Sequence, residues 1–308
     1  MSGKVQSLAV VGLLGLLAAA AKQREPERRK LPVLSAATLR PAIRREREAI
    51  DRQIDWASAM LAFAALADSG IEHYRGSFHN KTMYVPLAVA TITLAASLRD
   101  ALGPWRRRDR DAIDTVAFAT GLIGTGFHIY NVAKRPGRIS WLNLFYGAPL
   151  GAPAALSLAG LLRKAGALVR GRIAVCGVLP GKLLAWLVSL GLLGTSAEAA
   201  LLHFRGAYHN PAMVIPVAGP PVAAGLLAQA ARLPAQPHPG TRLALRLLAG
   251  VGLLGAGFHV YGIQRNMGGW RNWSQNLLNG PPLPAPPSFT ALAVAGLAAL
   301  RLIERGEA

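Results

Sequence analysis

The sequence predicts an all-α integral membrane protein, and three observations support this fold class. Hydrophobic residues make up 52% of the 308 residues, mean hydropathy is +0.31, and only 16% of residues are charged. Apolar stretches close to the roughly 20 residues that cross a bilayer recur along the chain. Lysine and arginine gather on alternate connections between these stretches, as they do in proteins that cross a membrane repeatedly. We therefore expect the lipid bilayer to surround the chain.

The predicted elements begin with an apolar segment at 5–21, which follows Lys4 and ends in a run of alanines. It is either a retained anchor helix or the hydrophobic region of a signal peptide, and we favour the anchor. Residues 22–53 mix arginines with acids and predict a basic amphipathic helix on the cytoplasmic surface. Eight further segments near spanning length follow at 54–73, 83–98, 112–132, 148–162, 183–203, 212–231, 243–263 and 288–303.

An internal repeat divides the remaining chain into two halves. The two halves match at EHYRGSFHN (72–80) and LLHFRGAYHN (201–210), at GTGFHIY (124–130) and GAGFHVY (255–261), and at GAPLGAP (147–153) and GPPLPAP (280–286). We therefore expect two tandem four-helix repeats, 54–172 and 173–308. Because each repeat has an even number of spans, both enter from the same side, and an axis along the membrane normal should relate them.

The distribution of basic residues predicts the orientation of the chain. Of the 34 lysines and arginines, 25 fall on the connections at 22–53, 99–111, 163–182 and 232–246 and in the C-terminal tail. This side should be cytoplasmic. In a bacterial-type inner membrane, the repeated histidine segments then lie at the periplasmic face.

Composition and motifs exclude several classes of function. The net charge of +19 does not indicate a nucleic-acid partner, because the basic residues are spread between apolar spans and form no basic face of a soluble fold. The single cysteine, Cys176, excludes intrachain disulfides and a c-type haem attachment site. The sequence contains no phosphate loop, dinucleotide fingerprint or nucleophile elbow, and whether the protein is an enzyme stays open.

Six repeated histidines form the candidate site. In each half one histidine ends the first span, one begins the second, and one lies in the last turns of the third. The six are His73, His79, His128, His203, His209 and His259. A histidine beside the apolar zone is expensive to leave unpaired, so such groups serve as ligands, proton carriers or members of a hydrogen-bonded network.

We expect these residues to bind haem b in a cytochrome b-like redox subunit. His73 with His128, and His203 with His259, would be axial ligands from facing helices. Other repeated polar residues would complete the cofactor site: Arg75 and Arg205 for propionates, His79 and His209 for a propionate, quinone or proton path, and Asn80, Asn210, Tyr130 and Tyr261 beside them. The expected partners are a periplasmic redox protein or exported dehydrogenase, and the quinone pool.

The glycines of GTGFH and GAGFH allow two interpretations. Small residues two and four positions before the histidine would leave the helix surface bare for a flat group such as a porphyrin. Glycines at this spacing are also common where membrane helices pack closely. The sequence alone leaves both interpretations open.

Two alternatives to haem use the same residues. Three histidines and one carboxylate, Asp68 or Glu198, make a plausible metal site for Zn, Cu or Fe in each half. We rank this behind haem, because Asp68 and His73 would lie about 140° apart on an ideal helix. Transport of a small solute through parallel repeats is the other alternative.

Overall fold

The computed structural model describes residues 36–103, 110–171, 173–234 and 237–306. The predicted anchor at 5–21 and the start of the 22–53 segment lie outside the described residues. Within the described residues the protein is helical, and the only extended pairing is an isolated bridge between Val175 and Val178. The prediction of an all-α protein is confirmed.

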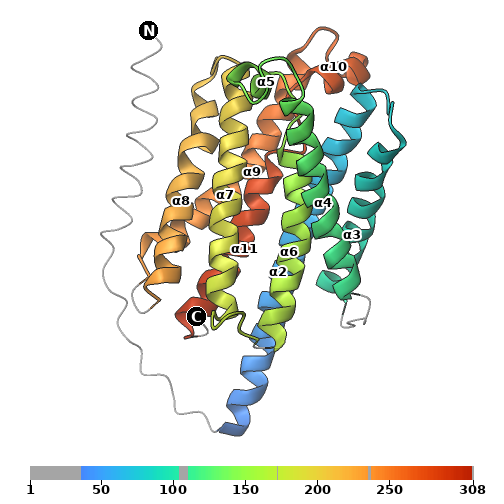
Figure 1. Ribbon diagram of the computed structural model, residues 1–308. Coiled ribbons are helices and arrows are strands. Elements are labelled where there is room, and N and C mark those ends of the chain that lie inside the picture. The colour runs from blue at the N-terminus through green and yellow to red at the C-terminus, as the bar shows by residue number, and fades with distance from the viewer. Residues whose placement is uncertain (1–35, 104–109, 172, 235–236, 307–308) are drawn as a thin grey trace.

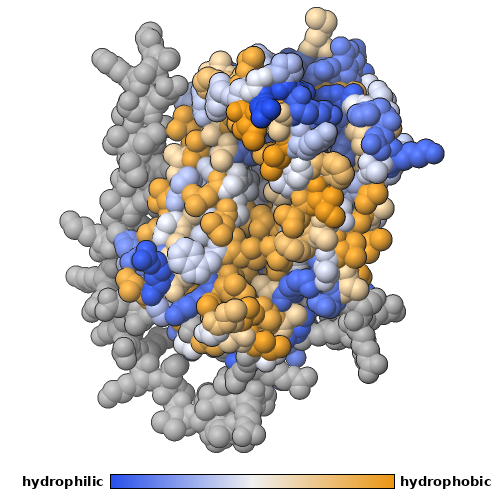
Figure 2. Space-filling view, viewed as in Figure 1, coloured by the Kyte–Doolittle hydropathy of each residue, from blue (hydrophilic) through white to orange (hydrophobic). Residues whose placement is uncertain are grey.

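Eight of the described helices are long and apolar enough to cross a membrane, as predicted. They are α2 (Ala36–Arg75), α3 (Val85–Leu102), α4 (Arg110–Ala133), α6 (Gly151–Gly171), α7 (Pro180–Arg205), α8 (Ile215–Arg232), α9 (Gly240–Arg265) and α11 (Pro287–Glu304). They stand side by side in one bundle (Figure 1). Hydrophobic residues cover much of the middle of the visible face, and hydrophilic residues gather above them (Figure 2).

Short elements cover one end of the bundle, where α2, α4, α7 and α9 finish (Figure 1). They are α5 (Trp141–Phe145), α10 (Trp273–Asn279) and the 3-10 turns η1 (Lys81–Tyr84), η2 (Pro211–Val214) and η3 (Gly269–Asn272). The six repeated histidines lie on or beside these elements. We call this end of the molecule the histidine end.

Helix α2 is longer than the predicted first span. It joins the described part of the segment at 22–53 to the span at 54–73 in one helix of 40 residues, where a separate surface helix was expected. Its N-terminal part projects beyond the bundle at the end opposite the histidines (Figure 1). Ile50 and Ile54 are fully buried in the hydrophobic core, and this packing carries the helix straight on from the bundle.

The helices pack in two groups of four. In the first group, α2 packs on α3 and α6, and α4 packs on α6 and α3. In the second group, α7 packs on α8 and α11, and α9 packs on α11 and α8. The two groups meet where α2 contacts α11 and where α6 contacts α7.

Small residues allow the backbones within each group to approach closely. A Cβ on Gly160 of α6 would lie 2.7 Å from the amide nitrogen of Phe118 on α4. A Cβ on Gly252 of α9 would lie 2.7 Å from the amide nitrogen of Thr290 on α11. In lipid, helices associate through such van der Waals contact, because lipid chains are as apolar as the side chains themselves.

One arginine that the sequence assigned to a cytoplasmic connection lies inside a span. Arg163 was counted with the connection at 163–182, but α6 continues to Gly171 and Arg163 is fully buried. Its guanidinium donates to Asp114, to Asp100 at 3.1 Å and to Ser97 at 3.2 Å. Asp55 lies 3.8 Å away. The assignment was wrong because these carboxylates, from three other helices, compensate the buried charge.

Candidate functional site at the histidine end

The turn after α2 sets the geometry of the first histidine motif. Ser77 and Phe78 adopt left-handed backbone conformations, with φ of 57° and 45°, which reverse the chain toward α3. Asn80 then caps η1, and its Oδ1 accepts a hydrogen bond from the amide of Thr82 at 3.0 Å. Asn80 was predicted to lie in the cofactor site, but its side-chain oxygen acts as a helix cap.

The second motif repeats this turn in detail. Ala207 and Tyr208 have φ of 54° and 46°, and Asn210 caps η2 by accepting from the amide of Ala212 at 2.9 Å. Each turn therefore holds the end of one spanning helix beside the start of the next.

The histidine that ends the first helix of each group bonds to the next helix. Nδ1 of His73 lies 2.8 Å from the carbonyl oxygen of Met83, and Nδ1 of His203 lies 2.7 Å from that of Met213. A carbonyl oxygen only accepts hydrogen bonds, so each Nδ1 carries the hydrogen and donates it. In the neutral ring, Nε2 then carries the lone pair.

The other four histidines have the same assignment. His128 donates through Nδ1 to the carbonyl of Pro149, and His259 donates to that of Pro282 at 2.7 Å. His79 and His209 donate to the glycine carbonyls within their own turns, at 3.0 and 3.1 Å. All six imidazoles are therefore oriented by a backbone acceptor, and in each neutral ring Nε2 carries the lone pair.

Within each group of helices some pairs of histidines lie within electrostatic reach of each other, but among the described residues no three are grouped as for one metal ion. His73 lies within electrostatic reach of both His128 and His79. His203 is similarly close to His209 and to His259. We call these two sets the first and the second histidine group.

Aromatic rings support one histidine in each group. Phe78 meets the ring of His73 edge-on, with the centroids 6.2 Å apart. Tyr208 meets the ring of His203 in the same way, at 6.1 Å. These contacts restrict rotation of both imidazoles.

The two repeated arginines tie the helix groups to each other. Arg75 donates to the carbonyl of Leu278 at the end of α10 and pairs with Glu72 at 2.8 Å. Arg205 donates to the carbonyl of Leu144 in α5 at 3.2 Å and lies over the ring of Phe145. Each arginine thus reaches from the first helix of its own group to a short helix of the other.

The two repeated acids lie one on α2 and one on α7. Glu198 packs against the N-terminus of α6, where a Cβ added at Gly151 would lie 3.2 Å from its Cγ. Asp68 interacts electrostatically with Glu198, Glu72 and Arg75. The imidazoles are instead oriented by backbone carbonyls, which the sequence does not reveal.

The glycines before the third histidine of each half were predicted either to pack against a neighbouring helix or to leave a bare surface for a porphyrin. Gly124 and Gly255, four positions earlier, are covered: an added Cβ would lie 3.2 Å from Pro153 and 2.9 Å from Pro286, respectively. This is helix packing. Gly126 and Gly257, two positions earlier, face open space. Two residues correspond to about 200° on a helix, so this bare surface does not lie beside the imidazole.

Tyr130 of α4 and Tyr261 of α9, both predicted in the cofactor site, have exposed rings. Each ring lies near a cation of its own helix. Lys134 approaches Tyr130 at 5.5 Å, and Arg265 approaches Tyr261 at 5.7 Å. Each ring therefore has a cation partner on its own helix, and Tyr261, unlike Tyr130, also lines the chamber described below.

A large chamber, which the sequence does not indicate, opens beside the second histidine group. Its volume is about 2000 Å³, and it lies between helices of both groups. The polar part of its wall includes Asp68, Glu198, Arg205, His203, His209 and His259. Small-molecule sites usually measure about 300–1,000 Å³, so this chamber has room for an extended organic molecule. The first histidine group does not line it.

Apolar and aromatic side chains form the rest of the chamber wall. Leu187 and Leu254 face it from α7 and α9. At its rim, Phe204 meets the rings of Trp141 and Phe145 with centroids 5.8 and 5.7 Å apart. Trp141 belongs to α5 and Phe204 to α7, so this contact joins the two groups of helices.

Among the described residues, no three histidine, cysteine or acidic side chains are grouped to hold a metal ion. Comparisons with protein-family models, with curated proteins and with solved structures find no match to this chain. The geometry of the histidine end is therefore the basis for any functional conclusion.

Proposed function

We propose that the protein is a cytochrome b-like redox subunit, which holds haem b on paired histidines at the periplasmic face of a bacterial-type inner membrane. The assignment of the imidazole nitrogens is the observation that carries the proposal. Each ring is fixed by a hydrogen bond from Nδ1, and Nε2 of the neutral ring has the lone pair. This is the arrangement of histidines that bind iron, including axial ligands of haem.

The proposal treats the chain as two tandem four-helix repeats that follow an anchor at 5–21. The packing of α2 with α3 and α6 corresponds to that of α7 with α8 and α11, and α4–α6 corresponds to α9–α11. A two-fold axis that relates α2 to α7 and α6 to α11 also relates the two contacts between the groups, because it turns the α2–α11 contact into the α7–α6 contact. Such an axis along the membrane normal brings both histidine groups to one face.

The axial pairs in this proposal are His73 with His128 and His203 with His259. Electrostatic proximity within each pair supports it. The chamber supports a porphyrin at the second pair, since it is lined by both histidines and by Arg205. Arg205 uses one of its N–H groups on Leu144, and its guanidinium has further donors for a propionate.

The redox partners are a quinone within the membrane and an exported dehydrogenase or soluble electron carrier on the periplasmic side. The apolar wall of the chamber suits the ring and chain of a quinone, and its polar rim suits the quinone oxygens. The excess of basic residues at the opposite end supports the periplasmic assignment of the histidine end.

Transport of a small solute is a second candidate, and two observations favour it. The chamber is wide and has Asp68 and Glu198 in its wall. The Arg163 network adds buried charge deeper in the first group, and intramembrane charge often marks a transport path. A site for one Zn, Cu or Fe ion is less favoured, because the described residues contain no group of three suitable ligands.

An absorption spectrum of the purified protein tests the proposal. After expression with ample haem, we expect a Soret band in the oxidised protein and a sharp α band after dithionite reduction. Replacement of His203 with Ala should change or remove these bands, and replacement of His238, a loop residue, should leave them unchanged. A spectrum with no haem bands would exclude haem, and solute uptake into liposomes by that protein would favour transport.

A further inference from the structure

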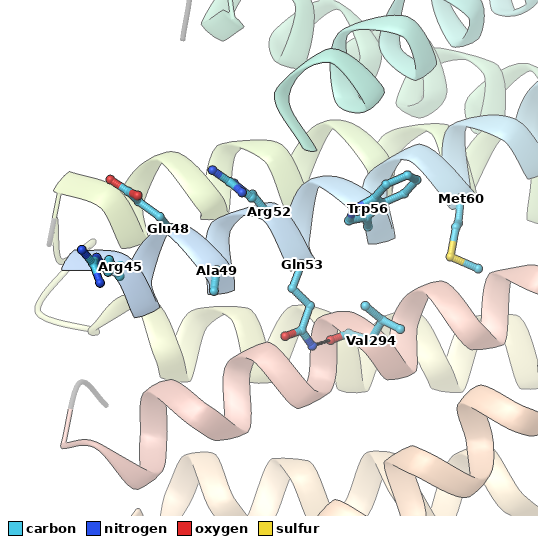
Figure 3. Close-up of a pocket in the computed structure, with 8 residues that line it drawn as sticks. All are labelled: Arg45, Glu48, Ala49, Arg52, Gln53, Trp56, Met60 and Val294. Atoms are coloured by element: carbon cyan, nitrogen blue, oxygen red, sulfur yellow. Dashed lines mark hydrogen bonds between the residues drawn. The ribbon is translucent and has the colours of Figure 1, made fainter. Parts of the chain in front are cut away.

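A basic and aromatic notch lies between α2 and α11 and extends toward the end opposite the histidines (Figure 3). Its volume is about 710 Å³. Arg45 and Arg52 lie at one end with Glu48 between them, Trp56 and Met60 lie further along α2, and Val294 of α11 forms the facing wall. We call it the α2 notch.

The side chains of the α2 notch change from charged to apolar along the helix axis. Gln53 donates to the carbonyl of Val294 at 2.6 Å and fixes the two helices in register. Glu46 pairs with Arg305, so the Arg45 end of the notch is level with the end of α11. Met60 lies 15 positions after Arg45, which corresponds to about 22 Å along the helix, or half the thickness of a bilayer with its headgroups.

The two guanidinium groups of the notch are available to a ligand. Arg45 and Arg52 are exposed, and neither makes an ion pair or hydrogen bond with a described residue. Trp56 lies one turn from Arg52 and is 42% exposed. Cations at the membrane boundary beside apolar surface favour an anionic group attached to an apolar chain.

The second helix group repeats part of this arrangement. Lys182 and Trp186 of α7 lie 130 residues after Arg52 and Trp56, and thus occupy the same positions in the other half. Trp186 is also exposed, at 39%. A cation four residues before an exposed tryptophan therefore occurs in both halves.

We propose that the α2 notch binds one anionic phospholipid of the leaflet opposite the histidine end. Arg45 and Arg52 bind the headgroup phosphate, and an acyl chain lies along Trp56, Met60 and Val294. The polarity gradient matches such a lipid over the thickness of one leaflet. The proposal concerns a different end of the molecule from the haem site and does not depend on it.

Quenching of Trp56 fluorescence by brominated lipids tests this site in the full-length protein in mixed micelles. The chain has six tryptophans, so the signal of Trp56 is the quenching that is lost in Trp56→Phe. We expect brominated phosphatidylglycerol to quench Trp56 at lower concentration than brominated phosphatidylcholine. The double variant Arg45→Gln/Arg52→Gln should weaken phosphatidylglycerol binding by about 25-fold, at about fivefold for each charge, and leave phosphatidylcholine unaffected.

The control is Arg232→Gln, which removes an exposed arginine at the end of α8. It should leave quenching of Trp56 unchanged. Equal affinities for the two lipids, or a double variant with unchanged phosphatidylglycerol affinity, would refute the proposal. If neither lipid quenches Trp56, the proposal is also refuted, because no acyl chain then reaches the notch. Another protein segment or a second copy of the chain would be its occupant instead.

Discussion

Replacement of Arg163 with Met should strongly destabilise the protein. The fully buried guanidinium donates to Asp114, Asp100 and Ser97, and it lies 3.8 Å from Asp55. Methionine fills a similar volume but leaves these carboxylates without the compensating charge. Removing one partner of a buried ion pair costs about 3–5 kcal/mol, and we expect a loss of unfolding free energy in this range.

The second helix group suggests how this loss can be reversed. Gly296 occupies the position that matches Arg163, and an added Cβ there would meet Leu245, Leu227 and Val188. An apolar network therefore fills the same place. Adding Asp55→Ala, Asp100→Ala and Asp114→Leu to Arg163→Met should recover most of the lost stability, because a buried ion network is often replaceable by apolar packing.

Reversible unfolding in mixed micelles measures both effects. Lys164→Met is the matched control: Lys164 pairs with Asp111 at 2.8 Å, but the Asp111 side chain is 86% exposed. An exposed pair of this kind contributes about 0–1 kcal/mol. If Arg163→Met lowers the free energy of unfolding no more than Lys164→Met does, the buried charges around Arg163 do not stabilise the fold, and the prediction is refuted.

Three further changes test the packing and the helix caps. Gly252→Ala should lower the free energy of unfolding by about 1–3 kcal/mol, because the added Cβ would press on Thr290. Gly250→Ala should be tolerated, because the space around Gly250 is open. Thermal unfolding of both variants checks this. Glu198→Ala should cost about 1 kcal/mol by removing the carboxylate beside the N-terminus of α6, and Glu198→Gln should retain part of the stability in the same assay. Asn210→Ala should cost about 1 kcal/mol and increase amide exchange in η2. Wild-type stability in any of these destabilising variants would contradict the corresponding contact.

Hydropathy predicted the spanning helices because their length and composition are local properties of the sequence. The end of α6 was missed for a non-local reason. Arg163 looks like a loop residue until Asp55, Asp100 and Asp114 are seen to converge on it from three other helices. No spacing within α6 indicates this convergence. The continuation of α2 through residue 53 likewise depends on burial of Ile50.

That the repeated histidines form one cofactor site in each half stays a prediction. Repetition of His73 as His203 did identify two residues that take the same position at the ends of α2 and α7. The hydrogen-bond acceptors were not predictable, because they are backbone carbonyls that any residue type can supply. Asn80 is a cap, and Tyr130 is a surface ring, although both are repeated as faithfully as the histidines.

The haem content of the purified protein decides whether the paired histidines hold haem b. Haem extracted as the pyridine complex, and expressed per mole of protein, should be near stoichiometric for the wild type and for His238→Ala. It should fall to background in the double variant His73→Ala/His203→Ala, which removes one axial ligand from each proposed pair. A wild type without haem, or a double variant that retains the full amount, would contradict the account.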